Sequence, residues 1–524
     1  MKPGHGKEAT VIGGALSLTL ATLIVKILGV IYKIPLANIL GEEGMGYFNS
    51  AYTVYAFFYL LCTAGVPKAV MILVTEKDTD SGEGAYVIAK IATRVFLALG
   101  IVVTLMFILL SEPLSRLIGS SASRATMIAI APSIVFISVA GVVRGLLSAR
   151  MRLLEIAVSQ ILEGVGKLVL GLALAILARH LSLPLYISSA LTVLGVSLGA
   201  LIGLVYLLCV ANVGNSRLKF GQKITLRKAK PMLKRIFSIS LPITASAAVM
   251  SLTSLIDLSI IMRRLETLGY SEAEAGALYG NYTTLAVPIF NLAVSIITPI
   301  SIAFMPVLTR ARVSADVRLR DGALRDAMEL SAIVTAPLLV GTLAFSKEML
   351  TLLFGNMNVS LGAPLLCLLI PGIFFMSPLL IINSALESEG HLKAPMLSML
   401  AGALTKLLVS YIMLGSAEYG VSGAPVGTVV SYAVSLAVSL LIAFSKTDLK
   451  PPVLLAQLIP YPAAVGCVFL SKQAYLSLLA TLGTGVAFVI AVLLCAVLYL
   501  LSMVLLGRIT PERIRKMSKY TKSA

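Results

Sequence analysis

Charged side chains are scarce in this chain. They make up 13% of its 524 residues, whereas hydrophobic residues make up 58%. A soluble domain carries about 25% charged residues. With a mean hydropathy of +0.97, the chain has too little polar surface to cover itself in water, which excludes a soluble globular protein.

Histidine is almost absent, and so are the motifs of nucleotide chemistry. The three histidines, His5, His180 and His391, lie far from any metal-ligand spacing. No loop of the form G-x-x-x-x-G-K-[ST] occurs, which excludes that route to ATP. The longest connector between apolar runs covers only residues 211–235, so there is no room for a soluble catalytic domain. We therefore predict no enzyme, no metal site and no resident cofactor.

What the chain does contain is a series of apolar runs about 20 residues long, the length of one helical membrane crossing. Barrel strands alternate and are shorter, and lipid admits only helices or closed barrels. We predict an all-α integral membrane protein of about fourteen transmembrane helices. Their expected ranges are 11–33, 47–74, 88–110, 126–147, 153–178, 184–211, 236–262, 279–307, 328–346, 360–385, 392–414, 420–444, 453–471 and 476–506.

The positive charge of the chain indicates its orientation. A formal net charge of +18 would suggest nucleic acid in a soluble protein, but cytoplasmic loops of membrane proteins collect Lys and Arg. If the N-terminus is cytoplasmic, the inner segments hold 31 of the 42 basic residues and the outer segments hold eight, while Lys26, Lys167 and Lys406 lie within helices. This asymmetry predicts that both termini are cytoplasmic and that nucleic acid is not a partner.

The connector 211–235 divides the chain into comparable halves. It carries eight basic residues and no acid. It is either a solvated loop that sets the topology or a segment that rests on anionic lipid headgroups, at ~1 kcal/mol for each basic residue. We expect an N-lobe at 1–222, a C-lobe at 223–450, and a third segment at 451–524 with the last two helices and a basic cytoplasmic tail.

A weak internal repeat supports two lobes. Gly41 and Gly269 follow the first helix of each half and lie 228 residues apart, and Pro67 and Pro299 lie 232 residues apart in the next helix. Repeated halves are how many transporters form a central site. The sequence therefore favours a transporter with two pseudo-symmetric six-helix lobes followed by two further helices.

Five charged residues of the predicted helices lie nearer the centre of the bilayer, where each costs at least ~2.5–3.5 kcal/mol. Glu163 and Lys167 are four residues apart and share a face, so they can neutralise each other. Lys26 either extends to the outer headgroups or lines a substrate path. Lys406 has no acid on its own helix, and Asp257 has no cation three or four residues away. Both are candidates for a substrate or ion path.

Several stretches carry a family resemblance. They are GGALSLTL at 13–20, KILGVIYKIPL at 26–36, LGEEG at 40–44, AGVPK at 64–68, and LID through RRL at 255–265. Together with the expected helix count, they resemble the polysaccharide-transporter branch of the multidrug/oligosaccharidyl-lipid/polysaccharide flippase superfamily. Within it the chain is most similar to the stage V sporulation protein B group of spore-forming bacteria, which is itself similar to the lipid II flippases.

The resemblance implies a V-shaped pair of lobes around a cationic cavity that holds an undecaprenyl-pyrophosphate headgroup. The implied function is alternating-access translocation of lipid II or a related lipid-linked oligosaccharide for the bacterial cell wall. The protein would be a monomer in the cytoplasmic membrane, in contact with membrane lipids and driven by sodium ions, protons or the membrane potential. Together with the charges inside the predicted helices, the resemblance makes Lys26, Lys33, Lys68, Arg263, Arg264 and Lys406 candidate substrate-binding residues. It makes Asp257, Glu163 and Lys167 candidate gating or ion-coupling residues.

The chain departs from the lipid II flippases at two places. Lys26 takes the position of the first arginine of their first helix, but Tyr32-Lys33 stands where an Arg-Asp pair would be. Residues 279–282 read Tyr-Gly-Asn-Tyr, without the arginine of that family's segment.

Under the 228-residue repeat, Asp257 lies at a depth similar to Lys26, so an ion pair between them is a candidate gate.

Three other functions compete with a flippase. A multidrug antiporter of the same superfamily would line its cavity with acids and aromatics for cationic drugs, whereas this chain places more cations than acids in its helices. A membrane glycosyltransferase or polymerase would need a substantial outer loop with catalytic residues. A purely structural scaffold would not explain charges inside the membrane.

Overall fold

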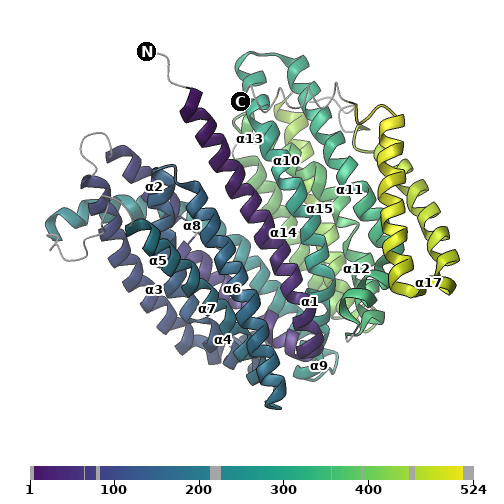
Figure 1. Cartoon of the computed structure of the whole chain (residues 1–524), viewed down its shortest axis with the longest axis horizontal. Helices are drawn as coiled ribbons and strands as arrows, with labels where there is room; N and C mark the ends of the chain where they lie inside the picture. The colour runs from purple at the N-terminus through teal and green to yellow at the C-terminus, as the bar shows by residue number, and fades with distance from the viewer. Residues whose placement is uncertain are drawn as a thin grey trace. The chain divides into compact units, whose positions relative to one another are not determined.

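The structure, a computed structural model, describes residues 5–63, 65–77, 83–212, 226–355, 357–391, 393–447 and 455–510. Within these ranges the chain consists of helices and short connections, with no strand (Figure 1). The predicted all-α class is confirmed. The chain divides into two compact units, Met1–Gly280 and Asn281–Ala524, and each is described separately.

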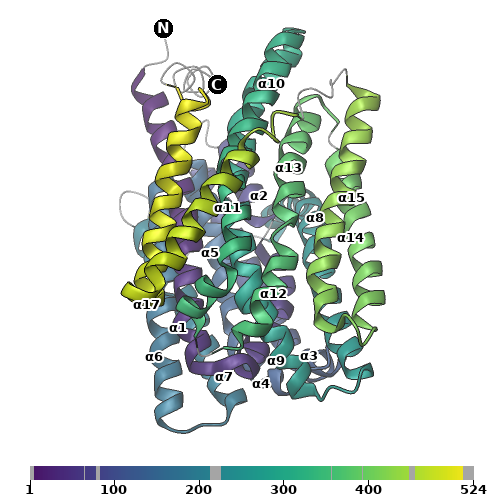
Figure 2. The same ribbon diagram turned by 90° about the vertical axis from the view of Figure 1, so that its right-hand side faces the viewer.

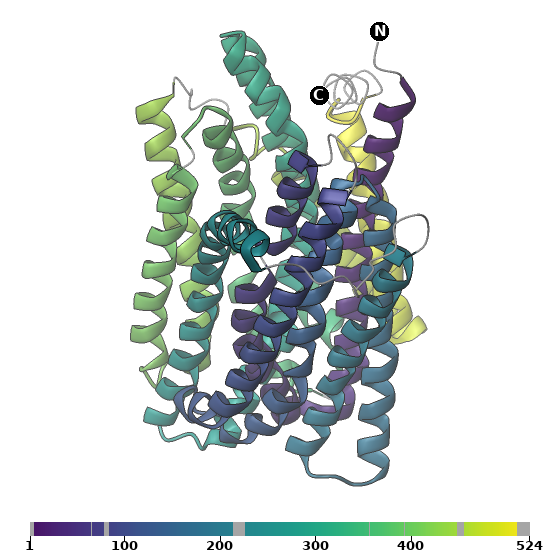
Figure 3. The ribbon, with the colours of Figure 1, turned by 90° about the vertical axis from the view of Figure 1, so that its left-hand side faces the viewer.

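The first unit contains the helices that carry the candidate site (Figure 3). They are α1 (His5–Thr63), α2 (Val66–Lys77), α3 (Glu83–Leu117), η1 (Ser121–Ser123), α4 (Arg124–Ile130), α5 (Pro132–Ala149), α6 (Leu153–His180), α7 (Leu185–Asn212), α8 (Leu226–Thr267) and α9 (Glu272–Asn281). Because α8 packs on α1 and α2, it belongs to this unit. The lobe boundaries at 222 and 450 stay a prediction.

The second unit contains the remaining helices (Figure 2). They are the π-helical turn η2 (Tyr282–Ala286), α10 (Val287–Val313), α11 (Val317–Phe354), α12 (Val359–Leu369), α13 (Gly372–Ser388), α14 (Lys393–Leu414), η3 (Gly420–Ser422), α15 (Gly423–Lys446) and α17 (Pro460–Leu505).

The helices are numerous and apolar enough for a multi-pass membrane protein. Eleven segments of the described chain could cross a membrane. Two of them, Ile24–Thr75 and Pro460–Leu505, have 52 and 46 residues, more than twice the ~20 residues of one crossing. They bend at Gly41 (φ 68°) and Gly483 (φ 74°), in the left-handed region that glycine adopts without strain. If each of these two segments crosses the membrane twice and α8 crosses once, the eleven segments and α8 together give fourteen crossings. This is consistent with the expected number.

Small residues hold α1 against α9 at backbone contact. A Cβ atom added to Gly46 would lie 2.1 Å from the carbonyl oxygen of Gly276, and one added to Gly280 would lie 2.2 Å from that of Glu42. Small residues at such crossings allow helices in lipid to approach closely and gain van der Waals contact. This crossing fixes the second arm of α1, which carries part of the candidate site.

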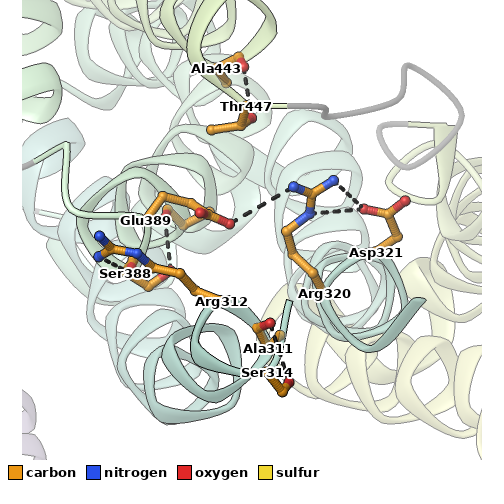
Figure 4. Close-up of polar contacts among 10 residues, drawn as sticks. Ala311, Arg312, Ser314, Arg320, Asp321, Ser388, Glu389, Ala443 and Thr447 are labelled. Carbon is orange, nitrogen blue, oxygen red and sulfur yellow. Dashed lines mark hydrogen bonds and ion pairs between the residues drawn. The ribbon is translucent and has the colours of Figure 1, made fainter. Parts of the chain in front are cut away.

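Polar contacts tie together several helix ends of the second unit (Figure 4). Arg312 of α10 donates to the carbonyl oxygen of Ser388 at 3.2 Å. Arg320 of α11 pairs with Asp321 at 3.1 Å and with Glu389 at 3.9 Å. The predicted topology places these ends on the cytoplasmic side. The contacts join the α10–α11 turn to the end of α13 and stabilise this end of the unit.

A lysine of α17 stabilises a break in α11. At Phe345 the backbone leaves the helical region (φ −120°, ψ 18°). Lys472 donates to the carbonyl oxygen of Ala344 at 2.8 Å and to Glu348 at 2.6 Å, and its ammonium lies 4.6 Å from the ring centre of Phe345. The lysine thus has a structural partner at the bend.

The predicted topology can be tested with single cysteines. In a variant whose five native cysteines are replaced, Glu272→Cys should react with an impermeant thiol reagent on intact cells. Lys228→Cys and Thr521→Cys should be protected, because the basic segments around them are retained in the cytoplasm. Position 521 lies outside the described residues. Labelling at position 228 from outside would contradict the orientation.

Candidate functional site

A cavity of about 500 Å³ lies within the first unit. Its walls come from both arms of α1 and from α5, α6 and α7. The size falls in the range of about 300–1,000 Å³ that small-ligand pockets occupy. Four charged side chains line it: Lys26, Arg144, Glu163 and Lys167.

The bend at Gly41 positions the α1 residues of this cavity. It folds the two arms of α1 back toward each other, so residues at similar distances from the bend meet. Tyr32 of the first arm lies 6.2 Å from Phe48 of the second, measured between ring centres. Lys33 donates to the amide oxygen of Asn49 at 3.2 Å. Lys26, one to two turns further from the bend, therefore faces the same cavity as the second arm.

Arg144 and Glu163 form an ion pair in the cavity wall. The Arg144 guanidinium of α5 lies 2.8 Å from the Glu163 carboxylate of α6, with the two side chains 14% and 30% exposed. The same nitrogen donates to the Ser159 hydroxyl at 3.3 Å. The structure corrects the suggested pairing of Glu163 with Lys167. The ion pair that it describes for Glu163 is with Arg144, which reaches it from the neighbouring helix α5.

Lys167 lies on aromatic rings instead. Its ammonium is 5.3 Å from the ring centre of Tyr32 and 5.0 Å from that of Tyr52, at the distance of cation–π contacts. Lys26 is exposed and lines the same cavity. Among the described residues, neither lysine has an ion-pair partner. Three cations against one carboxylate give the cavity wall a formal charge of +2, which suits an anion.

A row of aromatic rings follows the second arm of α1 into the cavity. Phe48 and Tyr52 stack with ring centres 6.1 Å apart, and Tyr52, Tyr55 and Tyr59 continue the row at 5.7 and 5.8 Å. The three tyrosines line the cavity together with Gln160. Tyrosine offers a flat apolar face and a hydroxyl, and glutamine offers an amide donor and acceptor. Such a wall can contact sugar rings and their hydroxyl groups.

The other predicted site residues of the first unit do not line the cavity. Lys33 bonds Asn49, and Lys68 is exposed on α2. Arg263 pairs with Glu266 at 3.3 Å and donates to the carbonyl oxygen of Leu117 at 3.3 Å, at the end of α3.

Three more predicted residues lie apart from the cavity lining. Arg264 lies next to Arg263 and is partly buried, and Asp257 is buried in α8 at 8% exposure. Lys406 is partly buried on α14 of the second unit. Roles for these residues, and the Lys26–Asp257 gate, stay predictions.

Among the described residues, no cluster of three His, Cys, Asp or Glu side chains could hold a metal.

Arg144 is the charged cavity residue that the sequence analysis did not single out. It lies near the inner end of the expected helix 126–147. A signal was present, because α5 and α6 form a hairpin that turns at residues 150–152. Arg144 lies nine residues before Leu153 and Glu163 lies ten residues after it, so the two lie at matching depths on neighbouring helices.

Two family models match the chain. One, described as polysaccharide biosynthesis protein, matches residues 11–312, and one described as MatE matches residues 282–412. Among curated proteins of Bacillus subtilis (strain 168), stage V sporulation protein B is 23% identical over 430 residues, which cover 80% of this chain and 81% of that protein. Lipid II flippase MurJ is 24% identical over 442 residues, covering 81% and 80%.

Solved structures show the same fold. Lipid II flippase MurJ in an inward closed conformation gives a TM-score of 0.70 at 14% identity, covering 93% of this chain and 98% of that one. An inward-facing multidrug resistance MATE family transporter of the MOP superfamily gives 0.65 at 15% identity, covering 83% and 98%. At these identities the likeness establishes the fold alone.

Proposed function

Because the chain belongs to the polysaccharide biosynthesis protein family of the multidrug/oligosaccharidyl-lipid/polysaccharide (MOP) flippase superfamily, and is a transporter rather than an enzyme, we propose that it translocates an undecaprenyl-pyrophosphate-linked cell-wall precursor. The substrate is lipid II or a related lipid-linked oligosaccharide, moved across the cytoplasmic membrane of a bacterium by alternating access. The observation that carries this proposal is the cavity of formal charge +2 in the first unit.

The physical demand of the task matches this cavity. A pyrophosphate cannot cross ~30 Å of hydrocarbon unaided, because its charges would lose their hydration. Lys26 and Lys167 supply point charges, and Arg144 supplies a planar guanidinium suited to two phosphate oxygens. The tyrosine row supplies surfaces for the sugars that follow the pyrophosphate.

The relatives support the substrate class. The chain matches lipid II flippase MurJ and stage V sporulation protein B over about four fifths of its length. The proposal extends to a role in peptidoglycan synthesis or sporulation, and to a monomer with both termini in the cytoplasm. Sodium ions, protons or the membrane potential would supply the driving force.

A cation-coupled multidrug antiporter is the second candidate. The MatE match at residues 282–412 and the fold likeness to a MATE transporter favour it. Against it stands the charge of the cavity, since three cations and one acid repel a cationic drug.

Reconstitution distinguishes these substrates. We expect purified protein in liposomes to translocate lipid II or a teichoic-type lipid-linked sugar, and to leave the cationic dye ethidium on its original side. The comparison of the two lipids identifies the sugar. Transport of ethidium without movement of either lipid would replace the flippase with the antiporter.

A further inference from the structure

The Arg144–Glu163 pair lies in a wall that otherwise attracts anions. We propose that Glu163 is an internal competitor for the substrate: it holds Arg144 until an anionic phosphate group takes its place, and it then drives that group off again. The inference rests on the proposed function and adds to it a residue that limits affinity so that release remains fast.

The ion pair occupies only part of the Arg144 guanidinium. An arginine side chain has five N–H donors. The bonds that the structure describes for Arg144, to Glu163 at 2.8 Å and to Ser159 at 3.3 Å, both come from Nη2. The Nε of Arg144 is buried without a hydrogen-bond partner among the described residues. The described bonds leave Nη1, which is not among the buried unpartnered atoms, for a second acceptor. A phosphate can therefore approach the guanidinium while Glu163 is still in contact.

The two lysines determine the order of events. Lys26 and Lys167 line the same cavity and have no described carboxylate partner, so their charges attract the anion first. Arg144 is already paired with Glu163, so its charge is partly neutralised before the anion arrives. A phosphate that reaches it must compete with Glu163, and each contact it gains there is partly offset by the carboxylate contact it replaces. Glu163 thus lowers the affinity of the cavity for the phosphate, while Arg144 stays available as a binding group.

A transporter must bind its substrate tightly enough to capture it and weakly enough to release it. A ligand that binds one conformation too tightly holds the protein in that conformation, because it shifts populations by its differential affinity. At the partial exposure of this pair, Glu163 remains close enough to recapture Arg144 when the phosphate loosens.

The test compares binding with turnover. In Glu163→Gln the side chain keeps its shape but loses its charge. We expect a fluorescent polyprenyl-pyrophosphate-linked sugar to bind purified protein about tenfold more tightly. We expect its maximal rate of translocation in liposomes to fall by a similar factor, because release becomes slow. KM and kcat therefore decrease together, which a merely structural role for Glu163 would not produce.

Three further variants and one control complete the design. Arg144→Gln should weaken binding about tenfold. Adding Glu163→Gln to Arg144→Gln should raise affinity by much less than the tenfold gain in the wild-type background, because only the direct repulsion by the carboxylate is then removed and not its competition for Arg144. Glu163→Asp keeps the charge but shortens its reach, and should give a smaller gain in affinity; it serves as the test if Glu163→Gln does not fold. The matched control is Glu155→Gln. Glu155 pairs with Arg152 at 2.8 Å on the same helix α6, outside the cavity, and its loss should alter neither affinity nor rate.

The outcomes separate the two proposals. If the wild type translocates the lipid but Glu163→Gln binds no more tightly and releases no more slowly, the competitor role is wrong and the flippase stands. If the wild type neither binds nor moves the lipid, both are wrong. Tighter binding and slower turnover in Glu163→Gln, with most of the gain in affinity absent when Arg144 is also replaced, support the inference.

Discussion

Replacing Lys26 with alanine should reduce lipid translocation to background, and replacing it with arginine should retain part of the activity. Lys26 lines the cavity and has no described ion-pair partner, so its charge is available to the pyrophosphate. One hydrogen bond to a charged group contributes about 1.5–3 kcal/mol, a factor of roughly 10–150 in rate or affinity. Arginine preserves the charge but changes the geometry of contact.

The measurement is translocation in liposomes at matched protein density. Lys393→Ala is the control, because this exposed lysine at the start of α14 does not line the described cavity. Wild-type rates in Lys26→Ala would mean that Lys26 only extends its ammonium toward the headgroups, and the binding role would be wrong.

Replacing Gly46 with leucine should prevent the first unit from folding. A Cβ atom at this position would already lie 2.1 Å from the Gly276 carbonyl oxygen, and backbone cannot move aside as a side-chain end can. Overpacking typically costs 1–3 kcal/mol for added methylenes, and a clash with backbone exceeds that. We expect Gly46→Ala to lower the apparent Tm by about 5–10 °C and Gly46→Leu to leave little monodisperse protein.

Heating followed by size-exclusion chromatography measures both variants, since the chain has no tryptophan for intrinsic fluorescence. Gly29→Ala is the matched control on the same helix, because a Cβ atom there meets nothing within 4 Å. An unchanged Tm in Gly46→Ala would contradict the close crossing of α1 and α9.

The sequence predicts the helices well because apolar length alone decides which segments can cross a bilayer. It also predicts a break in the chain near Gly41, which lies between the first two expected helices at 11–33 and 47–74. What length and composition do not reveal is that the chain continues as helix on both sides of that glycine and folds its two arms together. That fold brings Lys26 into the same cavity as Tyr52 and Tyr59.

The site is only partly predictable because a side chain's partner depends on the neighbouring helix. Spacing along one helix pairs Glu163 with Lys167, but the guanidinium of Arg144 reaches Glu163 from α5, and Lys167 lies over tyrosine rings. The 48-52-55-59 spacing of the aromatic row is equally typical of a packed core. Depth matching across the α5–α6 turn would have identified Arg144, whereas no periodicity distinguishes a core tyrosine from one that lines a cavity.

The most direct test of the central claim is whether the pyrophosphate is what the protein recognises. Two lipids with the same sugar and the same polyprenyl tail, one joined through pyrophosphate and one through a neutral ether, are offered to the same liposomes. The cationic wall of Lys26, Arg144 and Lys167 predicts rapid translocation of the pyrophosphate lipid and movement of the neutral one only at the protein-free rate. Equal rates for both lipids would contradict the account.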